Sequence, residues 1–303
     1  MKKFINTILS LILLLIIGTM VSAQEAQNLV VPLSKPNEIG FLEVDIKNGS
    51  IIVIGTDRKD IGISYSSAEG FDEDEYWESS WAEKLGQQLG DQLKIKLKDF
   101  GKSKSDNRDG LRKIQSNNFK LEITEQYNQV NIENNRMGAE PMLIKIEVPK
   151  TMNIDVENYN GGNLYVANVT GEINLESYNG AIKAEDIGGI ARASTYNGDI
   201  TIKFKEMPID GEMSFENYNG DISISVPPSY KSQFKVKTEM GEILSDLDLK
   251  VITDKNKPTT KGDGEVYKVY VDSWTFMELN GGSSNNIKIK TRNGDVLLRA
   301  NQK

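Results

Sequence analysis

Residues 158–226 have the sequence NYNGGNLYVANVTGEINLESYNGAIKAEDIGGIARASTYNGDITIKFKEMPIDGEMSFENYNGDISISV, and this stretch decides the fold. The tripeptide Tyr-Asn-Gly begins in it at Tyr159, Tyr178, Tyr196 and Tyr218, and its glycines are 19, 18 and 22 residues apart. A recurring period of this length is typical of repeat architectures, in which each unit must stack on a neighbour to bury its apolar face.

The segments between these glycines alternate between apolar and polar residues. Such period-two patterns predict short strands with one buried face, and Asn-Gly favours a tight turn. A hairpin meander or sandwich would show similar turns, but it gives no reason for the tyrosine to repeat. We therefore expect an all-β protein, a single-chain β-solenoid of short stacked strands with Gly and Asn-Gly turns. The predicted inward pairs are Ile154 and Val156, Leu164 and Val166, Ile173 and Leu175, Ile182 and Ala184, Ile200 and Ile202, and Ile222 and Ile224, with Asp155, Tyr165, Asn174, Lys183, Thr201 and Ser223 between them on the wet face.

Strand parity extends to the residues around each turn. Counting from the apolar positions places Asn158, Ser177, Thr195 and Asn217 inward, and the adjacent Tyr159, Tyr178, Tyr196 and Tyr218 outward. Equivalent residues of stacked strands lie about 4.8 Å apart, so the four tyrosines should form a line. They either pack only on one another or form an aromatic strip that binds sugar rings or a partner protein. The four tyrosines are therefore the candidate ligand-binding residues.

The first residues are typical of an export signal. Lys2 and Lys3 precede an apolar run, and Val21-Ser22-Ala23 is a small-residue cleavage site before Gln24. The length of the run also leaves a membrane anchor open. We expect residues 1–23 to be a cleaved signal peptide and the protein to be exported to the periplasm, cell surface or extracellular space, without stable membrane insertion afterwards.

Composition excludes several classes of function. The chain has no cysteine and no histidine, so disulfides, histidine bases and the commonest zinc ligands are absent. Its net charge of −8 opposes binding to nucleic acid. We expect no cofactor and no metal site; the acidic run at residues 72–78 lacks the ligand spacing of a calcium loop.

The remaining sequence extends the same pattern in both directions. Residues 41–54 predict two strands around a turn at Asn48-Gly49, and Ile61 and Ile63 predict a third. Residues 66–110 read as an insert with a helix, a strand and a mobile loop, whose Trp77 and Trp81 are expected to cover one end of the stack. The resulting division is a signal peptide at 1–23, a linker at 24–37, the domain at 38–299 with its insert, and a tail at 300–303.

Residues 119–123, 130–132 and 142–148 also predict strands, as do 234–236, 243–244, 267–271, 287–289 and 296–298. Together with LEVDIKNGSIIVIGTDRKDIGISY, FKLEITEQYNQVNI, IKIEVPK and the Tyr-Asn-Gly units, they give a sequence that resembles the bacterial putative-adhesin family of β-solenoid domains. The resemblance covers residues 38–299 apart from the insert. It implies a secreted or envelope-associated protein without established catalysis, and it brings no catalytic motif to these positions.

Three functions are compatible with these features. The first is a non-catalytic envelope protein, adhesive or structural, that binds a glycan or an envelope or surface protein through its repetitive face. The second is a polysaccharide-active enzyme, in which Asp199 and Asp221 would form a carboxylate pair; Asp295 has the same Asn-Gly-Asp context, which favours a role in the turn. A third, a sensor domain of the envelope, has no distinguishing feature in the sequence.

Overall fold

The structure, a computed structural model, describes residues 27–67, 121–134, 141–252, 259–262, 267–270, 273–282 and 285–301. These residues form strands and connections and contain no helix, which confirms the all-β class. None of them belongs to a helix that could cross a membrane. The expected signal peptide at residues 1–23 and residues 68–110 of the expected insert, with Trp77 and Trp81, lie outside the described residues, whereas residues 66 and 67 belong to the strand Asp60–Ser67.

Twenty of the described strands form one connected sheet, and its two halves, which we call sheet 1 and sheet 2, share β2 (Phe41–Thr56). Sheet 1 has the order β4–β5–β2–β7–β9–β11–β13–β21–β15–β20–β17 and sheet 2 the order β1–β3–β6–β2–β8–β10–β12–β14–β22–β16. The other strands of sheet 1 are β4 (Glu122–Gln126), β5 (Gln129–Asn134), β7 (Asn153–Asn160), β9 (Ile173–Asn179), β11 (Ala191–Asn197), β13 (Gly211–Asn219), β15 (Ser232–Met240), β17 (Leu249–Ile252), β20 (Thr275–Leu279) and β21 (Asn285–Asn293). Those of sheet 2 are β1 (Gln27–Pro32), β3 (Asp60–Ser67), β6 (Met142–Pro149), β8 (Leu164–Ala167), β10 (Ile182–Ile187), β12 (Ile200–Phe204), β14 (Ile222–Val226), β16 (Ile243–Ser245) and β22 (Val296–Ala300), and β18 (Thr259–Gly262) pairs separately with β19 (Tyr267–Tyr270).

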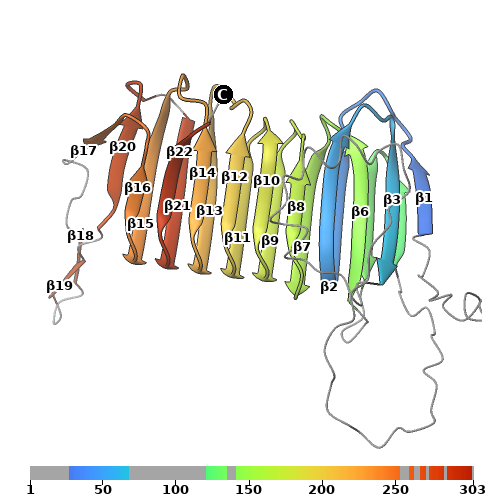
Figure 1. Cartoon of the computed structure of the whole chain (residues 1–303), viewed down its shortest axis with the longest axis horizontal. Coiled ribbons are helices and arrows are strands. Elements are labelled where there is room, and N and C mark those ends of the chain that lie inside the picture. Colours follow the sequence, from blue (N-terminus) through green and yellow to red (C-terminus); the bar gives the residue numbers. More distant parts are fainter. Residues whose placement is uncertain are drawn as a thin grey trace, which may run out of the picture.

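The repeating unit is a rung, which we define as one strand of sheet 1, a corner, and the following strand of sheet 2. Rungs β7–β8, β9–β10, β11–β12 and β13–β14 lie side by side along the longest axis of the molecule (Figure 1). Their strands pair in parallel, so that each Tyr-Asn-Gly asparagine aligns with the next: Asn160 with Asn179, Asn179 with Asn197, and Asn197 with Asn219. A hairpin meander would instead make neighbouring strands antiparallel.

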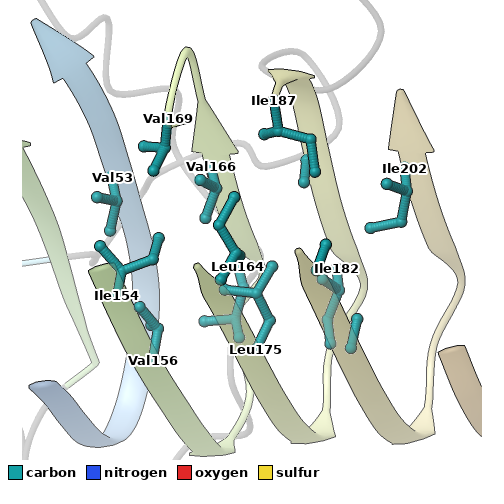
Figure 2. Packing of buried hydrophobic residues seen from close by; sticks show 14 of the residues in the cluster. Val53, Ile154, Val156, Leu164, Val166, Val169, Leu175, Ile182, Ile187 and Ile202 are labelled. Atoms are coloured by element: carbon teal, nitrogen blue, oxygen red, sulfur yellow. The ribbon is translucent and has the colours of Figure 1, made fainter. Parts of the chain in front are cut away.

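The predicted inward residues form one apolar core. Ile154 and Val156 of β7, Leu164 and Val166 of β8, and Leu175 of β9 are all buried. Figure 2 shows them with their neighbours between the strands of successive rungs. The period-two interpretation of residues 154–224 is therefore confirmed for the inward positions.

The order of the rungs differs from the order of the sequence at both ends. The first rung, β2, lies between β5 and β7 in sheet 1 and between β6 and β8 in sheet 2. At the other end, β21–β22 lies between β13–β14 and β15–β16, although it is last in the chain. Each terminal rung is thus enclosed by strands on both sides.

Antiparallel strands cover three of the four outermost parallel strands, namely β5, β15 and β6, whereas β16 pairs only with β22 among the described strands. In sheet 2, β3 pairs with β6 and β1 with β3; in sheet 1, β4 pairs with β5, β20 with β15, and β17 with β20. Such strands satisfy backbone groups that would otherwise be open to another chain. The predicted cover by Trp77 and Trp81 lies outside the described residues and remains a prediction.

The structure corrects four details. The two strands expected in residues 41–54 are one continuous strand that passes through the corner at Gly49, and β1 lies within the expected linker. The strand expected at 119–123 runs from Glu122 to Gln126. Tyr165, expected on the wet face, is 3% exposed because it packs against Ile52 and Leu143. This burial raises the pKa of Tyr165, as does Glu185, whose carboxylate accepts its hydroxyl hydrogen.

Candidate functional site

The four tyrosines form a continuous outer stack, which we call the tyrosine ladder. Ring centroids are 5.2 Å apart for Tyr159 and Tyr178, 5.1 Å for Tyr178 and Tyr196, and 4.7 Å for Tyr196 and Tyr218. Tyr159, Tyr178 and Tyr196 are 45%, 43% and 41% exposed, and Tyr218 is partly buried. The outward placement predicted from strand parity is therefore confirmed.

Stacking determines which part of each ring a ligand can reach. Interplanar angles are 19°, 6° and 11° along the ladder, so neighbouring rings cover each other's faces. At the far end, the guanidinium of Arg292 lies 4.8 Å from the ring centroid of Tyr218 and donates a hydrogen bond to its hydroxyl. From Tyr178 to Tyr218, the ladder consequently presents ring edges and a row of hydroxyl groups, because the faces of these rings are covered.

The residue before each tyrosine points inward, and three of the four (Asn158, Thr195 and Asn217) bind the corner. Asn158, Ser177, Thr195 and Asn217 are 3–8% exposed, as the parity count predicts. The amide of Asn158 donates to the carbonyls of Gly49 and Gly162, and that of Asn217 donates to Gly220 and Gly198. Thr195 donates to Gly180 in the same way. These bonds fix the corners from which the tyrosines project.

The asparagines after Tyr178, Tyr196 and Tyr218, together with Asn293, which follows Arg292, form a second stack that the sequence pattern does not predict. Asn197 donates to Asn179 at 2.8 Å, Asn219 to Asn197 at 2.7 Å and Asn293 to Asn219 at 2.6 Å, each from Nδ2 to Oδ1. Side-chain amides carry both a donor and an acceptor, so a parallel row of asparagines can bond continuously. We call Asn179, Asn197, Asn219 and Asn293 the asparagine ladder.

Close backbone packing requires the glycine in the second, third and fourth motifs. A Cβ at Gly198 would collide with the carbonyl of Gly180, and one at Gly220 would collide with that of Gly198. Tyrosine, asparagine and glycine therefore each meet their counterparts on the next rung, through rings, amides and backbone respectively. This explains why all three residues recur together.

The aspartates weighed as a catalytic pair bind backbone instead. Oδ1 of Asp199 accepts the backbone N–H of Asp221, and Oδ1 of Asp221 accepts that of Asp295, both at 2.8 Å. In the same way, Oδ1 of Asp295 accepts the backbone N–H of Glu242. Each carboxylate thus caps the next corner, which is the turn role that their shared context favoured.

Charge is unevenly distributed over the outer face of sheet 1. Near the N-terminal rungs lie Asp45, Asp155, Glu157 and Glu176. Partial burial raises the pKa of Glu157, and repulsion from Glu176, Asp45 and Asp155 raises it further. This part of the face is therefore strongly acidic.

The other half of the face carries cations. Lys288 and Lys290 of β21 lie beside Lys235 and Lys237 of β15. Burial raises the pKa of Glu216, but the hydrogen bond and attraction from Lys288, 2.5 Å away, outweigh burial and hold the pKa below its ordinary value. The signal in the sequence is alternation of lysine in FKVK and IKIK, but only the parallel register brings the two strands together.

Trp274 lies among these lysines. The Nζ of Lys235 is 4.4 Å from the centroid of the Trp274 ring, and those of Lys237 and Lys288 are 5.8 and 5.9 Å away. Cations at such distances are attracted to the aromatic ring. The tryptophan therefore groups three cations into one basic and aromatic patch.

The described residues contain no group of three or more side chains that could hold a metal ion. The acidic run at residues 72–78, considered for calcium, lies outside them.

Comparison with known proteins adds two solved structures. No family model and no curated protein matches the chain. The chain is similar to a putative cell adhesion protein from Clostridium sporogenes, with 11% identity over 91% of this chain and 100% of that one and a TM-score of 0.40. It is also similar to a putative adhesin from Bacteroides fragilis, with 10% identity over 92% and 98% of the two chains and a TM-score of 0.37.

Proposed function

We propose that this protein is an exported, non-catalytic β-solenoid that binds an extended glycan through the outer face of sheet 1, in the manner of an adhesin. The tyrosine ladder carries the proposal. Four rings project from four successive rungs at nearly constant spacing, and three of them keep more than two fifths of their surface exposed. A core residue would have no such exposure.

The ladder suits a repeating ligand for two physical reasons. Its rings are held by the inner polar residues and by each other, so little side-chain freedom is lost on binding, and this lowers the cost of association. The row of hydroxyls repeats once per rung, so several weak contacts with one polymer can act together. The ring edges and hydroxyls are matched to the mixed polar and apolar surface of a sugar chain.

The experiment is to titrate the purified mature protein with a panel of polysaccharides by calorimetry while assaying each for cleavage. Tyr178→Phe combined with Tyr196→Phe keeps the stack and removes two hydroxyls. We expect weaker glycan binding at an unchanged melting temperature, and no cleavage. Tyr127→Phe, which alters an exposed tyrosine outside the ladder, is the control. Equal glycan affinity in the double tyrosine variant and the unaltered protein would contradict the proposal, and so would cleavage of a polysaccharide.

Export is the second part of the proposal, and it rests on the residues before Gln24. N-terminal sequencing of the protein recovered from outside the cytoplasm should begin at Gln24. Recovery of the intact chain with Met1 in the membrane fraction would show an anchor in place of a cleaved signal.

A further inference from the structure

The outer face of sheet 1 is hollowed near the start of β13, around Ser214, which lies four residues before Tyr218. A cavity of about 380 Å³ spans β13, β21, β15 and β20. That volume is within the range of small-molecule sites, at its lower end. The lining residues that matter most for its chemistry are Arg192, Gln233, Lys235, Phe276, Asn286 and Lys288.

Register explains how the hollow forms. Arg192 aligns with Ser214, Ser214 with Lys288, and Lys288 with Lys235, so these residues form one row across four neighbouring strands. Ser214 is the small member of the row, and it leaves space between two long cations. Arg192 and Lys288 stand two strand spacings apart, roughly 10 Å, on either side of that space.

The lining is cationic. Arg192, Lys235 and Lys288 are opposed among the lining residues by Glu212. Lys288 also binds Glu216, and Lys235 lies over Trp274. Arg192 makes no ion pair within the described residues, so its guanidinium is available for a ligand. A guanidinium binds a carboxylate with two parallel hydrogen bonds.

The opposite sides of the hollow supply different chemistry. Asn286 and Gln233 align in a second row and carry side-chain amides. Phe276 and Ile252 align at the end of the cation row and form an apolar wall. Cations, amides and an apolar wall together are complementary to a ring that carries a carboxylate, several hydroxyls and one apolar face.

We infer that this hollow binds a carboxylate-bearing sugar unit of an acidic polysaccharide. Arg192 and Lys235 bind the carboxylate, Asn286 and Gln233 the hydroxyls, and Phe276 the apolar face of the ring. From Lys288, the strand β21 continues through Lys290 to Arg292, which contacts Tyr218. A chain seated in the hollow therefore extends onto the tyrosine ladder. The inference rests on the proposed function, because it names the ligand class of the same face.

The acidic half of the face limits where such a chain can lie. Asp155, Glu157 and Glu176 occupy the earlier rungs and repel a polyanion. An acidic polysaccharide is thus confined to the rungs from β11 onward, whereas a neutral one could follow the whole tyrosine ladder.

The test measures binding of polygalacturonate, neutral dextran, dextran sulfate and a single-stranded oligonucleotide to the mature protein, with Arg192→Gln, Lys235→Gln and Arg192→Lys variants. Lys203→Gln, an exposed lysine of sheet 2, is the charge-matched control. We expect polygalacturonate to bind most tightly and each Gln variant to lose about tenfold in affinity for it. Arg192→Lys should lose less affinity than Arg192→Gln, because lysine keeps the charge but cannot form the two parallel hydrogen bonds of a guanidinium. Lys203→Gln should bind as the unaltered protein does.

Four outcomes would overturn the inference. Equal affinity for dextran would show a neutral-sugar site and would leave the proposed function standing. Equal affinity for dextran sulfate and the oligonucleotide would show unspecific attraction of polyanions. Unchanged polygalacturonate binding in both Gln variants would place the ligand elsewhere. Absence of binding to every polysaccharide would remove the proposed function as well.

Discussion

Asn219 donates its side-chain amide to Asn197 across two rungs that lie 22 residues apart in the chain. Asn197 in turn donates to Asn179, so its side chain both gives and accepts a bond within the asparagine ladder. The ladder connects rungs through side chains alone, in addition to the backbone pairing of the sheet. It therefore contributes directly to the rigidity of the corner that holds the tyrosines.

Replacement of Asn197 by alanine should break this ladder in its middle. The amide of Asn219 and the carbonyl of Asn179 would each lose a partner in a partly buried corner, at a cost of about 1–3 kcal/mol. Thermal denaturation followed by circular dichroism measures the loss. Tyr196→Phe, which leaves the asparagines in place, is the control, and an unchanged melting temperature for Asn197→Ala would show that water replaces the ladder at no cost.

Two alanine substitutions, at Gly161 and Gly220, test whether close packing at the corner requires glycine. Gly161 has φ 61°, but an added Cβ would meet no atom closer than Asn48 Oδ1 at 3.8 Å. Gly220 has φ 127°, and its Cβ would collide with the carbonyl of Gly198. Gly161→Ala should cost about 1–2 kcal/mol from backbone conformation, whereas Gly220→Ala should cost more than about 3 kcal/mol because collision adds to strain. Equal losses of unfolding free energy in urea would disprove the steric explanation.

The outer stack and the inner core should differ in what they contribute. Tyr178 stacks on two neighbours, each pair worth about 0.5–1.5 kcal/mol, so Tyr178→Ser should cost roughly 1–3 kcal/mol. Leu175 is 1% exposed, and Leu175→Ala should cost about 2–5 kcal/mol. Tyr178→Phe preserves the stack and should leave stability nearly unchanged. A Tyr178→Ser protein as stable as the unaltered one would mean that the stack contributes nothing.

The inward and outward positions of the residues around Tyr178 could be predicted from the sequence. Period-two alternation placed Leu175 inside, and continuing the count past Ser177 placed Tyr178 outside. The asparagine ladder did not follow, because alternation gives the face of a residue and not the partner of its side chain. Asn197 carries the same Asn-Gly signal whether it only turns the chain or also bonds to Asn179 and Asn219.

The basic hollow was also missed, for a different reason. Arg192, Lys235 and Lys288 are far apart in the chain, and only the register of β11, β13, β21 and β15 aligns them. A pattern within one strand cannot show which strands are neighbours. The position of β21 between β13 and β15 depends on pairing between segments that are distant in the chain.

The acidic side chains around Glu157 make the stability of the protein depend on pH. The folded-state pKa of Glu157 is raised, by burial first and then by its acidic neighbours, so the folded protein holds this proton more tightly than the unfolded chain. Stability from this group is present at low pH and is lost as pH rises through the folded pKa. Glu157→Gln should therefore stabilise the protein at pH 7 by up to about 0.5 kcal/mol, since the group is largely exposed.

The gain from Glu157→Gln should shrink as salt is added and should disappear below the pKa of an ordinary glutamate. Melting temperatures at pH 3.5 and pH 7, at low and high salt, measure it, and the exposed Glu172→Gln serves as the control. A gain that persists at pH 3.5 would have to come from something other than charge.

The final prediction concerns the rung β21–β22. In a stack that followed the order of the sequence, the last rung would lie at the end, and its removal would cost one interface and leave the others intact. Here the last rung is internal: Ile289 pairs with Phe215 of β13 on one side and with Val236 of β15 on the other. Removing residues 283–303 would leave β15 and β16 without their parallel neighbour and would expose the inner edges of β13 and β14. We therefore expect the truncated chain to lose cooperative unfolding and to aggregate through those edges, as measured by thermal denaturation and light scattering.

The control is Ile289→Ala, which truncates a buried side chain within the same rung. It should lower the free energy of unfolding by about 2–5 kcal/mol but retain a single unfolding transition. If the truncated chain instead unfolded cooperatively near the melting temperature of the whole protein, β15–β16 would have moved to pair with β13–β14. The internal rung would then be a replaceable spacer.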